Sequence, residues 1–250
     1  MPRYTVATLT EREIAKTIDH SLLRPELDDA FVEDGCRLAA RYDVASVCVP
    51  PVHIRRAELI LGATDVAVGT VIGFPHGYTT TADKVTETER ALAAGATEID
   101  MVIQIGALKS GRDADVEADI RAVVETSHAA GAIVKVIFEN HYLTDDEKIR
   151  ACQLTEAAGG DFVKTSTGFA ASGATHDDLR LMRANTSPHI GVKAAGGVRT
   201  LDALIDVMNL GVTRIGATAT AAIIDDFRAR QRGDASVGSA AGAGAADHGY

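Results

Sequence analysis

Four charged residues stand inside segments that otherwise have the composition of apolar β-strands. Asp100 lies in EIDMVI at 98–103, and three later segments carry Lys135, Lys164 and Lys193. An ammonium group is costly to bury without a partner, so the chain must either neutralise these lysines or use them. For any one of them, a strand-end lysine that reaches water is the simpler interpretation. Their recurrence in consecutive segments favours a shared site.

Two of these lysines are placed to act on a carbonyl group. Lys164 and Lys193 fall in consecutive strand-like segments, and the backbones of neighbouring strands lie about 4.8 Å apart. A second cation and partial desolvation both favour the unprotonated amine, which is the form that makes a Schiff base. Asp100 would then move protons between iminium and enamine, directly or through a water molecule. An ordinary ion pair is the alternative role for Asp100, and the sequence alone leaves both open.

Short β-branched segments recur along the chain and indicate how these residues are positioned. Their centres are 23 to 35 residues apart, and helix-like segments such as 114–130 lie between them. The segments are 17–19, 45–49, 66–72, 98–103, 133–138, 161–165, 190–193 and 213–216. Eight strand–helix units predict an α/β protein with a (β/α)8 TIM barrel. A doubly wound open sheet is the alternative, although no G-x-G-x-x-G follows the first strand.

Local signals support this order of elements. Thr144 and Glu147 have the spacing of a capping box that opens a helix. Glycines that suit a left-handed helix end stand shortly before four of the strands, at Gly95, Gly131, Gly159 and Gly211. The last segment differs in composition, since 11 of its 18 residues are Gly or Ala. We therefore expect one barrel domain over 1–232 and a flexible tail over 233–250.

Composition excludes several classes of protein. The formal net charge is −10, with 25 Lys and Arg against 35 Asp and Glu and no basic block, so nucleic acid and anionic membranes are not expected partners. The three cysteines form no C-x-x-C pair and are expected to be reduced thiols. The first residues lack an apolar signal-peptide core, which predicts a cytoplasmic protein.

The chain resembles the 2-deoxy-D-ribose-5-phosphate aldolases, a family of class I aldolases with (β/α)8 architecture. The matching motifs run in order from about residue 15 to 217 and are TIDHSLL at 17–23, GFPHG at 73–77, EIDMVI at 98–103, GALKSG at 106–111, VKTSTGF at 163–169 and VKAAGGVR at 192–199.

This resemblance implies a role for each matching residue. Lys164 would be the Schiff-base lysine, Lys193 the neighbouring cation that favours its neutral form and relays protons, and Asp100 the proton-relay carboxylate. Asp19, Lys135 and Cys48 would line the substrate pocket, with Cys48 as a wall residue without a chemical role. The family reversibly cleaves deoxyribose 5-phosphate into acetaldehyde and glyceraldehyde 3-phosphate, without a cofactor or metal.

The phosphate is expected at the loops that follow the last three strands, where glycines expose backbone N–H groups. The candidate residues are Ser166, Gly168, Gly196, Gly197, Arg199, Gly216 and Thr218. Four sites depart from the family pattern. Thr218-Ala219 replaces a pair of serines, Gln104 replaces a common asparagine, and Arg24 replaces a common lysine. ENHY at 139–142 replaces smaller, less aromatic residues. The departures leave open a same-mechanism aldolase that acts on another, unphosphorylated aldehyde or sugar.

Two further expectations concern the chain end and the class of function. The tail ends in Tyr250. A flexible segment of this length can reach back to the pocket, so we expect Tyr250 to assist enamine proton transfer. A disordered end is the alternative. A non-catalytic sugar-phosphate-binding barrel is the competing class of function, but simple binding does not need Lys164 beside Lys193. Barrels of this type often pair, so a homodimer is also expected.

Overall fold

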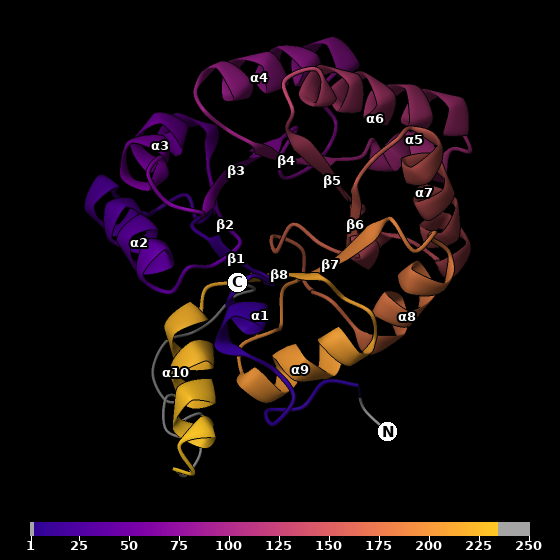
Figure 1. Ribbon diagram of the computed structural model, residues 1–250. Helices are drawn as coiled ribbons and strands as arrows, with labels where there is room; N and C mark the ends of the chain where they lie inside the picture. Colours follow the sequence, from indigo (N-terminus) through magenta and orange to yellow (C-terminus); the bar gives the residue numbers. More distant parts are fainter. Residues whose placement is uncertain (1–2, 235–250) are drawn as a thin grey trace.

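Eight parallel strands close into a barrel in the computed structural model, which describes residues 3–234 of the chain (Figure 1). Each strand pairs with the next one along the sequence, and β8 returns to pair with β1. The strands are β1 (Ile18–Ser21), β2 (Ser46–Val49), β3 (Ala67–Ile72), β4 (Glu98–Val102), β5 (Ile133–Ile137), β6 (Phe162–Lys164), β7 (Gly191–Ala195) and β8 (Arg214–Ala217). The predicted TIM barrel is confirmed, and the open sheet is wrong.

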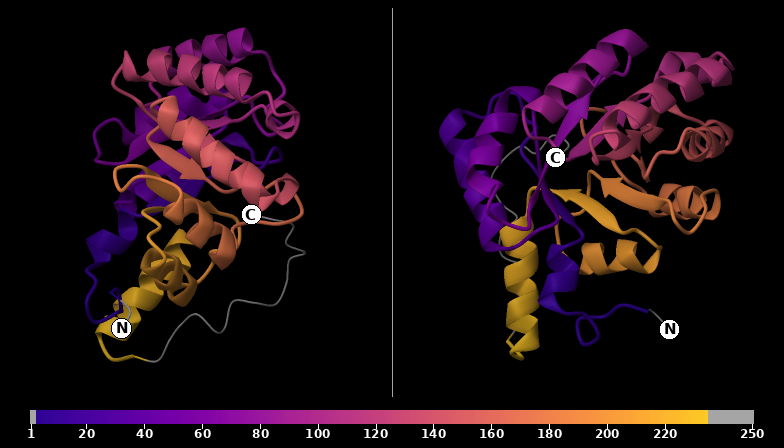
Figure 2. Two further views of the ribbon diagram at one scale, coloured as in Figure 1. Left: turned by 90° about the vertical axis from the view of Figure 1, so that its right-hand side faces the viewer. Right: turned by 45° about the horizontal axis from the view of Figure 1, so that its top comes forward.

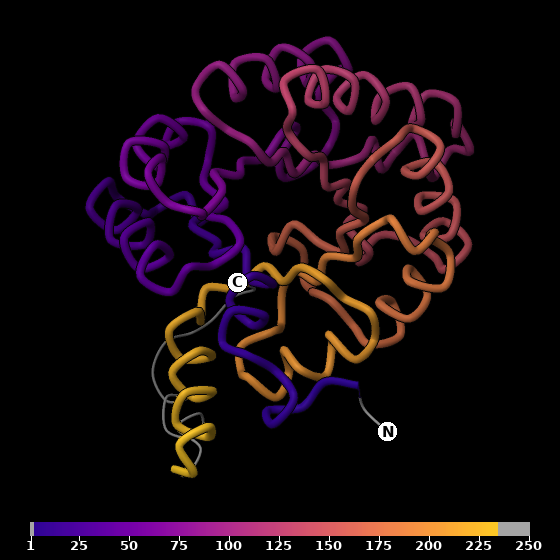
Figure 3. The backbone as a smooth tube through the Cα atoms, in the orientation of Figure 1, coloured from indigo at the N-terminus to yellow at the C-terminus, as the bar shows by residue number. Residues whose placement is uncertain are grey.

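Helices form a layer outside the strands, as the views in Figure 2 show. They are α1 (Glu11–Ala15), α2 (Asp29–Arg41), α3 (Ile54–Leu61), α4 (Thr81–Ala93), α5 (Ile105–Lys109), α6 (Asp113–His128), α7 (Asp145–Ala157), α8 (His176–Ala184), α9 (Leu201–Asn209) and α10 (Thr220–Gln231), with 3₁₀ turns η1 (Pro51–His53) and η2 (Asn140–Tyr142). The backbone passes round the barrel in sequence order, so that α1 meets α10 (Figure 3). Among the described residues, no helix has the length and apolarity to cross a membrane.

The predicted signals at the helix ends are present. The Thr144 hydroxyl accepts from the Glu147 backbone N–H, and the Glu147 carboxylate accepts from the Thr144 N–H, so this capping box is confirmed. The four glycines before strands have φ between 75° and 110°, namely Gly95, Gly131, Gly159 and Gly211. This backbone region costs a residue with a side chain about 1–2 kcal/mol, so glycine ends each helix with little strain.

Alternation along the strands separates an apolar outer face from a charged inner face. Val134, Val136 and Val163 are fully buried in the core between strands and helices. Each buried aliphatic side chain of this size contributes about 1.5–3 kcal/mol. Lys135 and Lys164 occupy the alternate positions of the same strands, and successive side chains of a strand point to opposite faces. The hydrophobic layer therefore fixes the strands, and with them the direction of the lysines.

The division of the chain into a barrel and a tail stays a prediction. Helix α10 ends at Gln231, which agrees with a boundary at residue 232. Almost all of the expected tail, 233–250, lies outside the described residues.

A buried ion pair that the sequence did not reveal joins α4 to α6. Lys84 and Asp119 have fully buried side chains, and their Nζ and Oδ2 atoms lie 2.5 Å apart. The Lys84 ammonium also donates to the Val102 carbonyl at the end of β4. The second Asp119 oxygen accepts from Thr81 and from Gln104, which gives a structural reason for glutamine at position 104. The pair thereby ties two outer helices to a strand end.

We expect Asp119→Ala to lower the free energy of unfolding by about 3–5 kcal/mol, because it leaves the buried Lys84 ammonium without its carboxylate. Asp115→Ala is the matched control on the same helix, since its carboxylate is 56% exposed. The control should cost less than about 1 kcal/mol. Urea denaturation of the two variants measures the difference. Equal stabilities would show that the Lys84–Asp119 pair does not hold α4 against α6.

Candidate active site

Charged side chains from six strands meet inside the barrel. Their side chains are at most 17% exposed, and they are Asp19 of β1, Glu98 and Asp100 of β4, Lys135 of β5, Lys164 of β6, Lys193 of β7 and Arg214 of β8. The sequence predicted five of these residues for the site, and the structure brings all five together. Glu98 and Arg214 were missed. Their positions two residues before Asp100 and Gly216, on the same face of β4 and β8, could have indicated them.

Asp100 is the carboxylate that three lysines share. Its Oδ2 atom accepts from Lys164 Nζ at 2.7 Å and from Lys193 Nζ at 2.7 Å. Its Oδ1 atom accepts from Lys135 Nζ at 2.9 Å. Burial by itself would raise the pKa of Asp100, but the three ammonium groups hold that pKa well below its usual range. Asp100 is thus ionised wherever these lysines carry charge.

The ion pairs continue from Lys135 through two residues at the start of their strands. Lys135 Nζ lies 2.6 Å from Glu98 Oε2, and Glu98 Oε1 accepts from Arg214 at 2.8 Å. Arg214 donates to Asp19 Oδ1 at 2.5 Å, and Asp19 Oδ2 lies 2.5 Å from Lys193 Nζ. Lys193 in turn donates to Asp100, which also binds Lys135. The six groups therefore close a ring in which acid and base alternate, and we call it the charge ring.

The charge ring balances without Lys164. Its three carboxylates are Asp19, Glu98 and Asp100, and its three cations are Lys135, Lys193 and Arg214. Lys164 is an additional ammonium that contacts the ring only through Asp100 Oδ2. Lys164 therefore stands outside the alternating ring, on the carboxylate oxygen that Lys193 also binds.

Lys164 stands at the carboxyl end of its strand. It is the last residue of β6 and is 2% exposed, whereas Glu98 and Arg214 are the first residues of β4 and β8. In barrels of this type the active site lies at the carboxyl ends of the strands. Lys164 thus stands at the strand end where the active site of such a barrel is expected, whereas Glu98 and Arg214 stand at the opposite ends of their strands.

Cys48 lies beside this network in the barrel wall. It packs with Leu23, Val71 and the half-buried Phe74. Burial raises the pKa of the Cys48 thiol to about 11, so it is protonated at neutral pH. All three cysteines of the chain are free.

The predicted phosphate residues lie together at the carboxyl ends of β6, β7 and β8. Gly168, Gly196 and Gly197 have φ of 88°, 78° and 97°. The loop after β6 passes so close that a Cβ at Gly196 would lie 3.0 Å from the Gly173 Cα. Ser166 is fully buried, and its hydroxyl has no hydrogen-bond partner within residues 3–234. Arg199 and Thr218 stand on the neighbouring loops, whereas Gly216, expected on a loop, lies within β8, one residue before its end. The seven residues thus line one side of the barrel rim.

Tyr250 lies outside the described residues, so its expected role in proton transfer stays a prediction. Glu139 and His141, two residues whose types can bind metal ions, have separate protein partners, Thr167 and Ser172. No cluster of three or more metal-ligating side chains occurs in the part of the chain that the structure describes.

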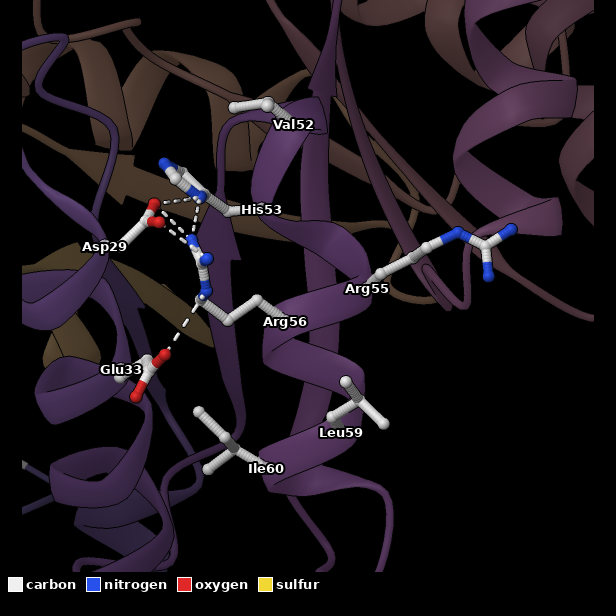
Figure 4. Close-up of a pocket in the computed structure, with 8 residues that line it drawn as sticks. All are labelled: Asp29, Glu33, Val52, His53, Arg55, Arg56, Leu59 and Ile60. Carbon is white, nitrogen blue, oxygen red and sulfur yellow. Dashed lines mark hydrogen bonds and ion pairs between the residues drawn. The ribbon is translucent and has the colours of Figure 1, made fainter.

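A cavity of about 530 Å³ lies on the outside of the barrel between α2 and α3 (Figure 4). Its charged side chains bind one another. Arg56 donates to Asp29 at 2.6 Å and lies 3.3 Å from Glu33, while His53 is 3.8 Å from Asp29. Leu59, at 83% exposure, forms part of an open apolar edge. The cavity is remote from the buried lysines, so we place the active site in the barrel.

His20 connects the site to the loop that carries Thr218. Its Nδ1 atom lies 2.9 Å from the hydroxyl of Thr220, the first residue of α10. Burial lowers the pKa of His20 to about 4, so the ring is neutral at physiological pH. This contact holds the β8–α10 connection against β1.

Fold and site together define a class of protein. A closed (β/α)8 barrel that buries a balanced charge ring, with one surplus lysine at the active-site end, has the arrangement of an enzyme that forms a Schiff base with a carbonyl substrate.

Comparison with known proteins places the chain within that class. A family model described as DeoC/LacD family aldolase matches residues 14–242, and the chain belongs to this family. It is 48% identical over 217 residues to a deoxyribose-phosphate aldolase of Clostridium perfringens, covering 87% of this chain and 96% of the relative. It is 51% identical over 211 residues to that of Bacillus cytotoxicus, covering 84% and 94%. A tetrameric deoxyribose phosphate aldolase from Aeropyrum pernix has a similar structure, with a TM-score of 0.82 at 28% identity, covering 88% of this chain and 93% of that one.

We expect the burial of His20 to make the free energy of unfolding depend on pH. In the unfolded chain the ring takes a proton near pH 6.5, whereas in the folded protein it stays neutral down to about pH 4. The unfolded state binds more protons between these values, so the free energy of unfolding falls as the pH falls through them. The contribution lost between pH 7 and pH 4.5 is about 2–3 kcal/mol.

The variant His20→Asn should lose that part of the pH dependence, and the matched control His176→Asn, at an exposed position, should keep it. Denaturation at pH 7 and pH 4.5 measures both. If His20→Asn shows the same pH dependence as the unmodified protein, His20 is not held neutral in the fold.

Proposed function

We propose that this chain catalyses the reversible aldol cleavage of 2-deoxy-D-ribose 5-phosphate to acetaldehyde and D-glyceraldehyde 3-phosphate through a Schiff base on Lys164. The observation that carries the proposal is the surplus ammonium of Lys164 on the Asp100 oxygen that Lys193 also binds. The names of the curated relatives support the substrate.

The first step forms the imine. The neutral Lys164 amine attacks C1 of the open-chain sugar, the Nζ–C1 bond forms, and the carbonyl oxygen leaves as water after it has been protonated. Lys193 Nζ and Asp100 Oδ2 lie 2.7 Å apart, and the same Asp100 oxygen lies 2.7 Å from Lys164 Nζ. These two groups would donate and accept the protons of this step. The positive charge of Lys193 disfavours a second positive charge on Lys164, which favours the attacking form.

The second step breaks the carbon–carbon bond. The C3 hydroxyl gives its proton to Asp100, directly or through water, the C2–C3 bond breaks, and its electron pair moves to the iminium nitrogen, which yields glyceraldehyde 3-phosphate and an enamine. Asp100, directly or through water, returns a proton to C2, and hydrolysis then releases acetaldehyde and the free lysine. These steps use only side chains of this chain and call for no metal or cofactor.

The phosphate would bind at the rim beside β6–β8, where the glycine-rich loops and Arg199 stand. Asp19 and Lys135 would act through the charge ring by fixing Lys193 and Asp100. The cytoplasmic location and the homodimer expected from the sequence stay predictions.

Trapping with borohydride tests the Schiff base. We expect incubation with acetaldehyde and borohydride to leave an ethyl group on Lys164, located by peptide mass mapping, and Lys164→Met to lower kcat by at least about 10⁴-fold. Lys109→Arg is the control, because Lys109 is an exposed lysine on α5. An adduct at another lysine, or none, would overturn the mechanism.

Substrate preference tests the phosphate site. We expect kcat/KM for deoxyribose 5-phosphate to exceed that for deoxyribose by at least about 10²-fold, since each hydrogen bond to a charged group contributes about 1.5–3 kcal/mol. Arg199→Gln should reduce this preference about 10-fold, while Arg180→Gln, an exposed arginine on α8, should leave it unchanged. Equal activity on both sugars would favour the same-mechanism aldolase for unphosphorylated substrates.

A further inference from the structure

A second cavity opens at the barrel rim and shares the loop after β6 with the predicted phosphate site. Its volume is about 330 Å³, and residues after β3, β4, β5 and β6 line it. Tyr78, Tyr142 and Phe169 give it an aromatic wall, and no lysine or arginine of the described chain is among its lining residues. The cavity therefore fits a neutral group and lacks the cations that a phosphate would need.

The single acid in this wall is Glu139, which is 2% exposed. Its Oε2 atom accepts from both the backbone N–H and the hydroxyl of Thr167. Its Oε1 atom is buried and has no hydrogen-bond partner within residues 3–234. Burial also raises the pKa of the Glu139 carboxyl. A buried acceptor that is left unpaired costs about 1–3 kcal/mol, so this oxygen calls for a donor that residues 3–234 do not supply.

The backbone of Glu139 is itself held in an unfavourable conformation. Its φ of 56° and ψ of 67° lie in the left-handed region, although it is not a glycine. Such a conformation costs about 1–3 kcal/mol and persists where surrounding contacts fix it. On one side Phe138 N–H donates to the Lys164 carbonyl at 3.0 Å, and on the other Asn140 N–H donates to the Thr165 carbonyl at 2.9 Å. Glu139 is thus fixed directly beside the end of the strand that carries Lys164.

A purely structural role explains only half of this arrangement. To hold the loop after β6, Glu139 needs Oε2 alone, because both bonds from Thr167 end there. This structural role does not explain why Oε1 has no partner among the described residues or why the backbone of Glu139 is left-handed. Both are accounted for if Oε1 accepts a hydrogen bond from a bound substrate.

We propose that Glu139 is a specificity-determining residue whose Oε1 accepts a substrate hydroxyl, the one on the carbon next to the carbonyl of the acceptor aldehyde. This inference rests on the proposed function. With C1 bound to Lys164 and the phosphate held at β6–β8, the carbon chain crosses the rim between them. Its hydroxyls project sideways, and Glu139 Oε1 is a buried acceptor without a protein partner beside Lys164. A site built to bond a hydroxyl discriminates strongly against an analogue that lacks it.

Two acceptor aldehydes that differ by this hydroxyl provide the test. With acetaldehyde as donor, we compare D-glyceraldehyde 3-phosphate with 3-oxopropyl phosphate, which lacks only the hydroxyl. We expect the protein to prefer the hydroxylated acceptor in kcat/KM by about 10- to 100-fold. In Glu139→Gln, the amide oxygen can keep the hydrogen bonds from Thr167. The amide NH₂ group then takes the place of Oε1, so that a donor replaces the acceptor. The preference should then fall to within about 3-fold.

Glu125→Gln is the matched control, because it makes the same substitution at an exposed position on α6, away from the cavity. It should keep the full preference. Ile105→Phe is a second variant that narrows the cavity from α5 without altering Glu139, and it should also lower the preference. It decides the question if Glu139→Gln fails to fold.

The outcomes separate this inference from the proposed function. If acetaldehyde is trapped on Lys164 but the unmodified protein does not distinguish the two acceptors, the role of Glu139 is wrong and the aldolase proposal stands. The same holds if Glu139→Gln, or Ile105→Phe where the former does not fold, retains the preference. If no adduct forms on Lys164, the proposed function itself fails.

Discussion

The rest of the structure depends on the neutralisation of charge inside a barrel that excludes most water. Each carboxylate or ammonium moved into such an interior costs several kcal/mol unless an opposite charge repays it. Alternating acids and bases from β1, β4, β5, β7 and β8 meet this requirement in a closed ring. Any one member is held by two others, so strand register and side-chain position support each other.

Lys164 gains its chemical character from being left out of this balance. Its ammonium adds one positive charge to a set that is already neutral, and it shares an acceptor atom with Lys193. The ring stabilises the barrel interior by giving each of its buried charges an opposite partner. In the proposed function, the same contacts hold Lys193 and Asp100 beside the lysine that would form the Schiff base.

The rim above the lysines is divided by charge. The loops after β7 and β8 carry glycines and Arg199, which suit an anion, whereas the cavity beside β3–β6 is aromatic and holds one acid. Lys164 lies on β6, where these halves meet. A substrate with a phosphate at one end and hydroxyls along its chain matches this division. The strained backbone at Glu139 is the local cost of placing an acid there.

The sequence by itself determined the barrel and indicated most of the residues proposed for the reaction. The spacing of β-branched segments and the lysines at Lys164 and Lys193 depend on local pattern, which is written along the chain. Sequence analysis did not predict the roles of Glu98 and Arg214 or the ion pair of Lys84 with Asp119. Their partners are far away in sequence and meet them only when the barrel closes. The unpaired oxygen of Glu139 also became visible only in the tertiary structure. Which charges balance, and which atom is left free, are properties of distances across the barrel, so only the folded chain decided them.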